Sequence, residues 1–287
     1  MASRTVLITG CSSGIGLAAA VVLAKQPDAK FKVYATMRNT GKKEELEKAG
    51  RDCLDKTLFI RALDVNDAKT FKPVLDEIIN SDGKLDILIN NAGQGMLVIS
   101  ETAPVEGVRQ VFNTNVIGLF QLTQAVIPIM KKQQSGHIIN VTSVGGFMGV
   151  PYNAIYCASK FAVEGMTEGL ACELMPDNIR FSLIEPGPVT TKFRENLQSA
   201  SGTGLDSPDV DEDTKKRFLS MMTKIRDSYA HATQTADEIG YVILKAATDE
   251  NPSLRYQTSA DAERRAKSKL ADPTGNNYLD IYRKVIE

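Results

Sequence analysis

The sequence is poor in the residues that build metal centres and disulfide-linked domains. Among its 287 residues there are only four cysteines, two histidines and no tryptophan. The cysteines, Cys11, Cys53, Cys157 and Cys172, form no C-x-x-C pair. A zinc site of the Cys/His type is therefore not expected, and we assign no metal. Four unpaired thiols are typical of a cytoplasmic protein.

Long apolar runs and an excess of charge are also missing. No window approaches the ~18 consecutive apolar residues of a membrane span, and the N-terminal RTVLITG is too short for a secretory signal. Without such a signal, the glycosylation-like tripeptide Asn140–Thr142 is read as chance. The net charge of −1 gives no electrostatic basis for binding nucleic acid or an anionic membrane. A cytoplasmic location is expected, and peripheral membrane contact is left open.

Six apolar, β-branched runs recur along the chain, and each ends in turn-forming or polar residues. Their continuous hydrophobicity indicates strands of a sheet that is covered on both faces. Helical segments separate them, including a long one over 105–132 and another over 154–174. This alternation predicts an α/β fold with a doubly wound parallel sheet, whose strand carboxyl ends share one ligand-binding edge. The six runs are residues 5–10, 31–37, 57–65, 85–93, 136–143 and 179–187.

The pattern changes from about Thr190. Residues 197–213 are rich in Ser, Gly and Asp, which predicts a flexible loop or a lid over a substrate site. Helices are expected over about 213–231 and 236–247, and a polar stretch, DAERRAKSKLADPTGNNY, follows them.

The chain shows no internal repeat and no low-complexity linker that would divide it. Residues 1–287 are therefore predicted to form one domain. Within it, about 4–191 would carry the cofactor and catalytic groups, and about 192–287 would form the substrate lid and the C-terminal segment.

A glycine-rich turn, TGCSSGIG, lies between the first predicted strand and the first predicted helix. Gly10 permits a tight turn, Gly14 permits close approach of the backbone to a ligand, and Gly16 permits close packing of helix on strand. The start of the helix offers N–H groups and a positive dipole end to a pyrophosphate. Because the turn has this strand-to-helix context, a dinucleotide site is favoured over a structural turn.

The second run indicates which dinucleotide binds. NAD sites usually have Asp or Glu near its end, but here YATMRNTGKK has Arg38 and no carboxylate before Glu44. A guanidinium pairs well with a 2′-phosphate, and Ser12 adds a hydroxyl. We therefore predict NADP(H) rather than NAD(H). The alternative is that Arg38 is a solvated surface charge.

Polar residues end the third and fourth runs. Asp64 in LDV is placed to bond the adenine amino group, and the small residues of NNAG, 90–93, suit close passage of ribose and adenine. Either segment is also compatible with a simple turn. Their position at strand carboxyl ends favours the cofactor site.

Four polar residues form a candidate reactive group. Tyr156 and Lys160 share one face of a predicted helix. Reduction of a carbonyl by hydride transfer needs a proton donor, and an adjacent ammonium lowers the pKa of a phenol from about 10. Ser143 would hold the substrate oxygen, and Lys160 would also hold the nicotinamide ribose. Asn115, which suits a helix interior poorly, would anchor a water that relays protons.

In this order and spacing, TGxxxGIG, NNAG, Asn115, Ser143, YxxxK and PGPVTT resemble the short-chain dehydrogenase/reductase family. The resemblance implies one Rossmann-type domain with about seven parallel strands, Tyr156 as acid/base, and a homodimer formed by the helices that hold Asn115 and Tyr156. It also implies that PGPVT contacts the nicotinamide carboxamide. The predicted cofactor-binding residues are Gly10, Ser12, Ser13, Gly14, Ile15, Gly16, Arg38, Asp64, Val65, Asn91, Ala92, Gly93, Tyr156, Lys160, Pro186, Gly187, Val189 and Thr191.

Longer stretches, among them SVGGFMGVPYNAIYCASKFAVEG and DPTGNNY, resemble the subgroup of 17β-hydroxysteroid and photoreceptor-type retinol dehydrogenases. This implies an NADP(H)-dependent oxidoreductase that interconverts a hydrophobic alcohol and its carbonyl. A steroid 17β-hydroxyl/17-ketone pair of the estradiol/estrone type is the first expectation, and all-trans-retinol/retinal is the alternative. A catalytically silent NADP(H)-binding regulatory protein is an alternative of another class, but it would not require the four reactive residues.

An apolar wall would suit a steroid or a polyene. Several of its predicted members are expected to be ordinary core residues instead. The predicted substrate-binding residues are Ser143, Gly145, Met148, Val150, Pro151, Tyr152, Tyr156, Pro188, Phe193, Met221, Met222 and Ile225.

Overall fold

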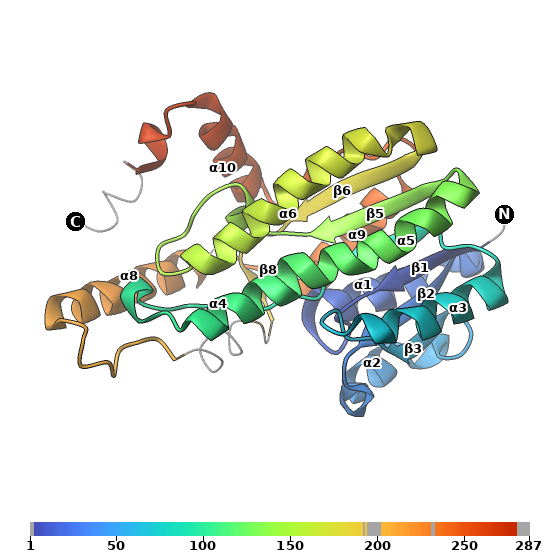
Figure 1. Cartoon of the computed structure of the whole chain (residues 1–287), viewed down its shortest axis with the longest axis horizontal. Helices are drawn as coiled ribbons and strands as arrows, with labels where there is room; N and C mark the ends of the chain where they lie inside the picture. The colour runs from blue at the N-terminus through green and yellow to red at the C-terminus, as the bar shows by residue number, and fades with distance from the viewer. Residues whose placement is uncertain (1–2, 192, 194–201, 231–232, 280–287) are drawn as a thin grey trace.

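A seven-stranded parallel sheet forms the centre of the computed structural model, which describes residues 3–191, 193, 202–230 and 233–279 (Figure 1). The strand order is β3-β2-β1-β4-β5-β6-β9, and it reverses between β1 and β4. This confirms the predicted doubly wound fold, and in such sheets ligands bind at the carboxyl ends of the strands where the order reverses, here β1 and β4. The strands are β1 (Arg4–Ile8), β2 (Phe31–Met37), β3 (Leu58–Ala62), β4 (Ile87–Asn90), β5 (Gly136–Val141), β6 (Ile179–Glu185) and β9 (Arg255–Gln257).

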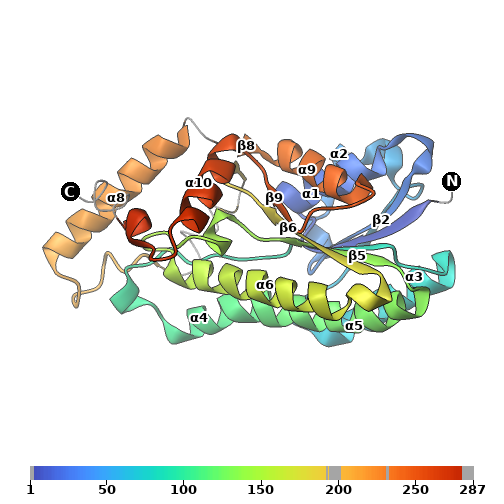
Figure 2. The same cartoon turned by 90° about the horizontal axis from the view of Figure 1, so that it is seen from above.

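Helices cover both faces of the sheet (Figure 2). One hydrophobic core lies under α1, α2 and α9, and a second lies under α3, α5 and α6. Strands β4 and β5 are buried along their whole length, which explains their continuous hydrophobicity. The helices are α1 (Gly14–Ala24), α2 (Glu44–Ala49), α3 (Phe71–Asp82), α4 (Val105–Phe112), α5 (Leu119–Gln133), α6 (Ala154–Glu173) and α9 (Ala236–Thr248).

The prediction of a single long helix over 105–132 is wrong. The chain forms α4, then a π-helical stretch, η6 (Asn113–Gly118), and then α5. A Cβ on Gly118 would collide with the carbonyl oxygen of Val65, so the glycine allows this stretch to approach the loop after β3 closely. Widened turns of this kind are rare and often occur at functional sites.

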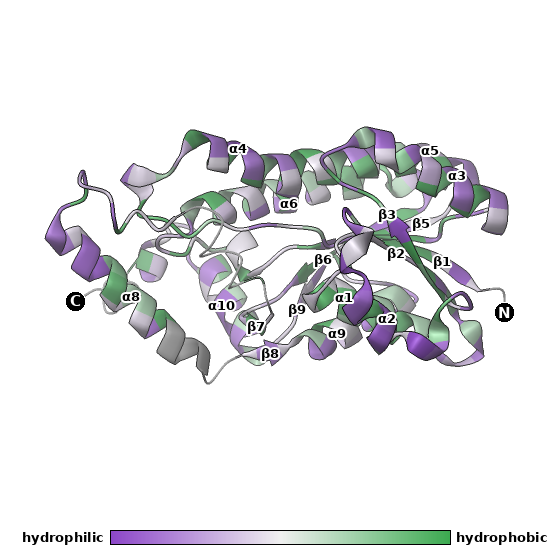
Figure 3. Cartoon of the chain, turned by 90° about the horizontal axis from the view of Figure 1, so that it is seen from below, coloured by the Kyte–Doolittle hydropathy of each residue, from purple (hydrophilic) through white to green (hydrophobic). Residues whose placement is uncertain are grey.

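Two short strands near Thr190 and Thr235 form a second, two-stranded sheet apart from the main one. The short strands β7 (Val189–Thr190) and β8 (Gln234–Thr235) pair with each other, and α8 (Glu212–Ala230) lies between them in the sequence. Figure 3 shows hydrophilic and hydrophobic residues alternating along α8, whereas β1 and β2 are mainly hydrophobic. The predicted helices over about 213–231 and 236–247 correspond to α8 and α9.

The loop expected over 197–213 is described from residue 202 onward, and this part is docked on the body. The N–H of Ile99 donates to the carbonyl oxygen of Thr203 at 3.0 Å. Gly204, with a left-handed φ of 81°, packs tightly against the side chain of Thr102. The described part of the segment therefore packs on the loop after β4, and its role as a substrate lid stays a prediction.

Two elements near the C-terminus have no counterpart among the segments identified from hydrophobicity. Strand β9 has only three residues, and α10 (Ala260–Ala271) lies within the stretch that was noted only as polar. No helix in the described ranges is both long and apolar enough to cross a membrane. Asn140 lies on buried β5, which agrees with reading its glycosylation-like tripeptide as chance.

Candidate active site

The glycine-rich turn is closed by hydrogen bonds between the ends of β1 and β4. Gly10 has a left-handed φ of 75°, and a Cβ at this position would lie 2.8 Å from Cα of Ala92. The hydroxyl of Thr9 accepts from the N–H groups of Asn91 and Ala92, at 3.0 Å each. The Asn91 amide donates to the carbonyl oxygen of Thr9 at 2.9 Å. The Asn91 side chain therefore shapes the turn itself.

The N-terminus of α1 faces the PGPVTT segment. The side chain of Ser13 does not cap α1, and the first turn carries no acidic residue. Gly14 has a left-handed φ of 59°, and a Cβ here would lie 3.3 Å from the methyl group of Thr191. An uncapped helix start with this dipole is suited to an anionic group. The backbone turn, the helix start and the nearby Thr191 fit a dinucleotide cofactor.

Three of the predicted cofactor-binding residues lie around the ends of β2 and β3. Arg38 is exposed and, in the described part of the chain, forms no ion pair with a carboxylate. The carboxylate of Asp64 accepts from the N–H of Asn66 at 3.0 Å, so one of its oxygens stabilises its own loop. Val65 is buried next to Gly118. The cofactor contacts of these residues remain predictions.

Ser143 and Tyr156 come together around Gly145. Ser143 precedes the short helix η7 (Val144–Gly146), and its hydroxyl accepts from the N–H of Gly145 at 3.0 Å. A Cβ on Gly145 would lie 3.4 Å from the Tyr156 ring and 3.5 Å from Ser143 Oγ. A Cβ at this position would be tight only against Cys157 Sγ, at 3.2 Å, and would be in contact with both hydroxyl-bearing residues.

Lys160 lies behind Tyr156 in a nearly dry environment. Its ammonium donates to the carbonyl oxygen of Val141 at 2.9 Å and lies 5.8 Å from the centroid of the Tyr156 ring. Burial lowers the pKa of Lys160 from 10.5 to about 8, and the nearby Glu164 opposes that shift. A buried ammonium beside a phenol stabilises the phenolate, as acid/base work by Tyr156 requires.

Asn115 lies at the centre of the π-helical stretch and is fully buried. Its side-chain carbonyl accepts from the N–H of Gln94 at 2.9 Å. Its amide donates to the carbonyl oxygen of Gln94 at 2.8 Å and to Ser159 Oγ at 2.9 Å. Both amide donors are therefore used by the protein, and only one lone pair of the carbonyl remains for a water.

Ser159 is a site residue that the sequence analysis missed. Its hydroxyl donates to the carbonyl oxygen of Tyr156 at 2.7 Å while it accepts from Asn115. It thus joins the π-helical stretch to the helix that carries Tyr156 and Lys160. Its position between Tyr156 and Lys160 was the available signal, because serine is not a favoured residue inside a helix.

An apolar region borders Tyr156 on the lid side. The ring centroid of Phe193 lies 5.7 Å from that of Tyr156, and Tyr152 packs edge-on against Phe218 at 4.8 Å. Met222 packs against the same small core as Tyr152. Of the other predicted wall residues, Gly145, Met148 and Met221 are buried, and Val150, Pro151, Pro188 and Ile225 are half-buried.

The C-terminal segment reaches back to this region. The hydroxyl of Tyr278 donates to the carbonyl oxygen of Gly149, in the loop between Ser143 and Tyr156. The ammonium of Lys269, on α10, lies 5.0 Å from the Tyr278 ring centroid. Residues far apart in the sequence thus shape one side of the site.

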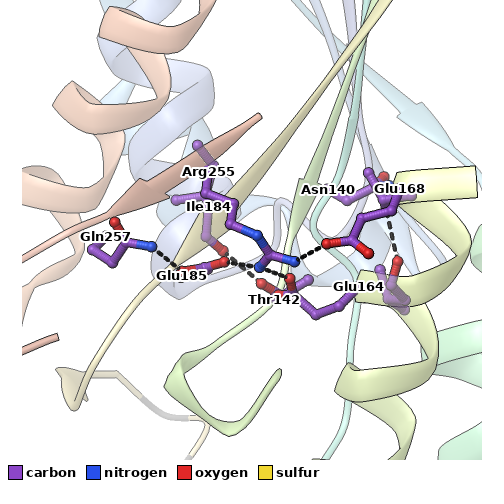
Figure 4. A network of polar contacts seen from close by, with 10 residues as sticks. Asn140, Thr142, Glu164, Glu168, Ile184, Glu185, Arg255 and Gln257 are labelled. Atoms are coloured by element: carbon purple, nitrogen blue, oxygen red, sulfur yellow. Dashed lines mark hydrogen bonds and ion pairs between the residues drawn. The ribbon is translucent and has the colours of Figure 1, made fainter. Parts of the chain in front are cut away.

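A cluster of charged side chains lies beneath α6, and the sequence analysis did not identify it (Figure 4). Arg255 on β9 contacts three carboxylates, those of Glu164, Glu168 and Glu185. The side-chain amide of Gln257 also donates to Glu185, at 2.5 Å. Glu164 lies four residues after Lys160, and this spacing was the only signal in the sequence.

The cysteines have no place in this chemistry. Burial raises the pKa of the Cys11 thiol to about 12 and also raises the pKa of Cys157. Both thiols remain protonated at neutral pH, which makes them poor nucleophiles. The reading of Cys157 as an ordinary thiol agrees with its burial.

Comparison with known proteins gives consistent matches over nearly the whole chain. The profile described as short chain dehydrogenase matches residues 4–202. The 17-beta-hydroxysteroid dehydrogenase type 1 of Homo sapiens is 40% identical over 281 residues, which span 97% of this chain and 84% of that protein. Retinol dehydrogenase 8 of Bos taurus is 40% identical over 279 residues, spanning 97% and 88%. The crystal structure of a short-chain dehydrogenase from Streptomyces avermitilis matches with a TM-score of 0.77 at 26% identity, covering 99% of this chain and 97% of the other.

Proposed function

The chain belongs to the short-chain dehydrogenase family and is an oxidoreductase, and from this premise we propose that Tyr156 is its acid/base, with Ser143, Lys160 and Asn115 supporting it. The observation that carries the proposal is the arrangement of Ser143 Oγ and the Tyr156 ring around Gly145. These two groups can contact one substrate oxygen from adjacent sides. The reaction that they suit is the interconversion of an alcohol and a carbonyl.

When bound, a nicotinamide dinucleotide supplies or accepts the hydride. In the reducing direction, the phenol of Tyr156 gives its proton to the carbonyl oxygen. The Ser143 hydroxyl accepts from the N–H of Gly145 at 3.0 Å, and its O–H makes only a long hydrogen bond to the carbonyl oxygen of Pro186, at 3.5 Å, which it can exchange for one to the substrate oxygen. The ammonium of Lys160 stabilises the phenolate that Tyr156 becomes. In the oxidising direction Tyr156 takes the proton from the alcohol.

We propose NADP(H) as the preferred cofactor. The support is the exposed guanidinium of Arg38 just beyond β2, with no described carboxylate paired to it. A 2′-phosphate would gain a charge-assisted hydrogen bond from it. The 2′-hydroxyl on the ribose of NAD(H) is uncharged and would not form this charge-assisted bond with Arg38.

We propose a hydrophobic alcohol/carbonyl pair as substrate, with the steroid 17β-hydroxyl/17-ketone pair first and all-trans-retinol/retinal as the second candidate. The aromatic contact between Phe193 and Tyr156 gives the approach to the reacting oxygen an apolar character. The two relatives described above carry names from these two substrate classes. A direct comparison is cofactor oxidation, followed by nicotinamide absorbance, with estrone, androstenedione and all-trans-retinal.

The experiment that tests this function is Tyr156→Phe, with the exposed Tyr241→Phe as matched control. The Tyr156→Phe variant should bind NADPH normally and lose turnover by a hundredfold or more, in line with general acid–base contributions of ~10²–10⁴. The control should keep the wild-type rate. Wild-type turnover by Tyr156→Phe would contradict the proposal. NADPH binding by a wild-type protein that turns over no carbonyl in a broad panel would favour the silent regulatory alternative.

We propose a homodimer that uses the face formed by α5 and α6 and the π-helical stretch. Three large apolar side chains are exposed on these elements: Ile117 at 49%, Phe120 at 38% and Phe161 at 43%. Large apolar and aromatic side chains exposed on neighbouring elements are typical of protein interfaces. A reducing compartment such as the cytoplasm is also proposed, because all four cysteines are free thiols.

A further inference from the structure

Four titratable residues lie in a row along α6. Tyr156, Lys160, Glu164 and Glu168 are spaced four residues apart, so they follow one face of the helix over three turns. The row begins at the proposed acid/base and ends at Glu168, whose side chain is 54% exposed. Titratable side chains therefore follow one face of α6 from the candidate active site to the solvent.

Arg255 holds the far half of this row against the sheet edge. Its Nη1 contacts carboxylate oxygens of both Glu164 and Glu185, and its Nη2 contacts Glu168 at 2.6 Å (Figure 4). One cation thus faces three acids. Glu185 is fully buried, and the side chain of Glu164 is 6% exposed. The buried pair shares a single positive partner, so full ionisation of both acids is unfavourable.

One oxygen of Glu164 lies against the turn that carries Ser143. A Cβ on Gly146 would lie 2.6 Å from Glu164 Oε1. The hydroxyl of Thr142 donates to the carbonyl oxygen of Ile184 at 3.1 Å, and it also lies near enough to Glu164 to lower the pKa of that carboxyl group. In the part of the chain that the structure describes, Glu164 Oε1 has no hydrogen-bond partner. An unpaired buried oxygen is costly when charged, and this favours protonation of the carboxyl group.

The charges around Glu164 act on Lys160 as well. Burial, followed by the charge of Glu185, raises the pKa of Glu164 to about 7. Burial lowers the pKa of Lys160 to about 8, and the charge of Glu164 works against this. The charged groups facing Glu164 are Lys160 and Glu168 on α6, Glu185 on β6 and Arg255 on β9. Gly146 of η7 also lies against it, and the neutral side chain of Thr142 acts on it as well.

We propose that Glu164 is a positioning residue for the oxidoreductase reaction: its negative charge, one helical turn from Lys160, helps that lysine to keep its proton and thereby sets the pH range in which Tyr156 works. This inference rests on the proposed roles of Tyr156 and Lys160. It adds that the cluster around Arg255 is an electrostatic support of the site as well as a structural tie.

The test compares pH profiles of kcat/KM for carbonyl reduction in the wild type, Glu164→Gln and Glu168→Gln. Loss of the Glu164 charge lets Lys160 lose its proton more easily, so the alkaline limb of Glu164→Gln should move about one pH unit lower. Glu168→Gln also removes a contact with Arg255, but Glu168 lies one helical turn farther from Lys160 than Glu164 does. The alkaline limb of its pH profile should therefore coincide with that of the wild type. Thermal unfolding and NADPH fluorescence titration identify variants that fold and bind cofactor.

A second arm does not depend on the folding of Glu164→Gln. In Glu185→Gln the charge that opposes ionisation of Glu164 is lost, so an inflection near pH 7 should move to lower pH. Unshifted profiles in folded Glu164→Gln or Glu185→Gln would overturn the inference. Failure of the proposed function is distinguishable, because it would appear as an inactive wild type or as a Lys160→Met variant with wild-type turnover.

Discussion

The side-chain amide of Asn115 donates to the hydroxyl of Ser159 at 2.9 Å, and this bond joins the π-helical stretch to the helix of Tyr156 and Lys160. Both residues are fully buried. Ser159 passes the connection on to the carbonyl oxygen of Tyr156 at 2.7 Å. The position of the proposed acid/base is thus coupled to an irregular turn on a neighbouring helix.

Removal of the hydrogen bond between Asn115 and Ser159 should destabilise the protein and lower its turnover rate. Ser159→Ala leaves a buried amide donor of Asn115 without its partner, which costs about 1–3 kcal/mol. We expect a lower midpoint of thermal unfolding and a reduced kcat, because Tyr156 and Lys160 lose a lateral support. The exposed Ser220→Ala on α8 is the control and should change neither quantity. An unchanged unfolding midpoint for Ser159→Ala would show that the link carries no stability.

Glycines on and beside α6 should respond differently to the same substitution. In Gly146→Ala the new methyl group would lie 2.6 Å from Glu164 Oε1, so either the turn that carries Ser143 or the buried Glu164 side chain must shift. We expect a loss of about 1–3 kcal/mol in unfolding free energy, typical of overpacking, and a lower kcat. Gly165→Ala on α6 meets no atom within 4 Å and should be neutral or stabilising by up to ~1 kcal/mol. Chemical denaturation measures both, and equal effects would contradict the packing argument.

The burial of Lys160 should appear in the pH dependence of stability. Its pKa falls from 10.5 to about 8 on folding, so the charged form is penalised in the folded state. One pKa unit corresponds to about 1.4 kcal/mol, and the full penalty, about 3 kcal/mol, applies below pH 8. Between pH 8 and 10.5 the unfolded chain binds more protons, so wild-type stability should gain from Lys160 as the pH rises.

Lys160→Met removes this contribution. The free energy of unfolding of Lys160→Met should exceed that of the wild type most strongly below pH 8. This difference should shrink as the pH rises toward 10.5. Its turnover should nevertheless be lost, because the phenolate of Tyr156 has no cation beside it. A stability difference that is independent of pH, measured by denaturant unfolding at several pH values, would contradict the assignment.

Arg38 should determine cofactor preference. Arg38→Asp replaces a partner of the 2′-phosphate with a charge that repels it, so kcat/KM with NADPH should fall at least tenfold while that with NADH rises. The exposed Arg51→Asp is the control for a general change of charge. Equal preference of the wild type for the two cofactors, or an unaltered preference in Arg38→Asp, would count against NADP(H).

The apolar face of α6 should control assembly. Phe161→Glu places a charge in the proposed interface and should convert a dimer into a monomer, as measured by light scattering with gel filtration. Met175→Glu changes another exposed apolar residue, 69% exposed just beyond α6, and should leave the dimer intact. A wild-type monomer at micromolar concentration would refute the proposed dimer.

Local patterns predicted the parts of the fold that have strong periodicity or distinctive spacing. The apolar runs became six of the seven strands, and the helix expected over 154–174 is α6. Strand β9 was not predicted, because it has three residues and only one of them is buried, so the sequence shows no apolar run there. The π-helical stretch was not predicted because no local pattern marks it, and its close packing of Gly118 on Val65 is a contact between residues distant in the sequence.

The site divides in the same way. Tyr156, Lys160, Ser143 and Asn115 stand out through residue type and spacing, and the fold gathers them at one end of the sheet. Ser159 and the acids around Arg255 do not stand out, because their importance comes from partners brought together by folding. Arg255 is 91 residues from Glu164 in the sequence, and no local pattern connects them.

The contact of Tyr278 with Gly149 has a consequence for how such a protein can diversify. The family profile ends at residue 202, whereas Tyr278 lies far beyond it and still touches the loop between Ser143 and Tyr156. The tail can therefore change in sequence while the reacting groups stay fixed, and each change would alter the rim of the site. A graft of residues 260–279 between homologues is thus a route to new selectivity on an unaltered catalytic base.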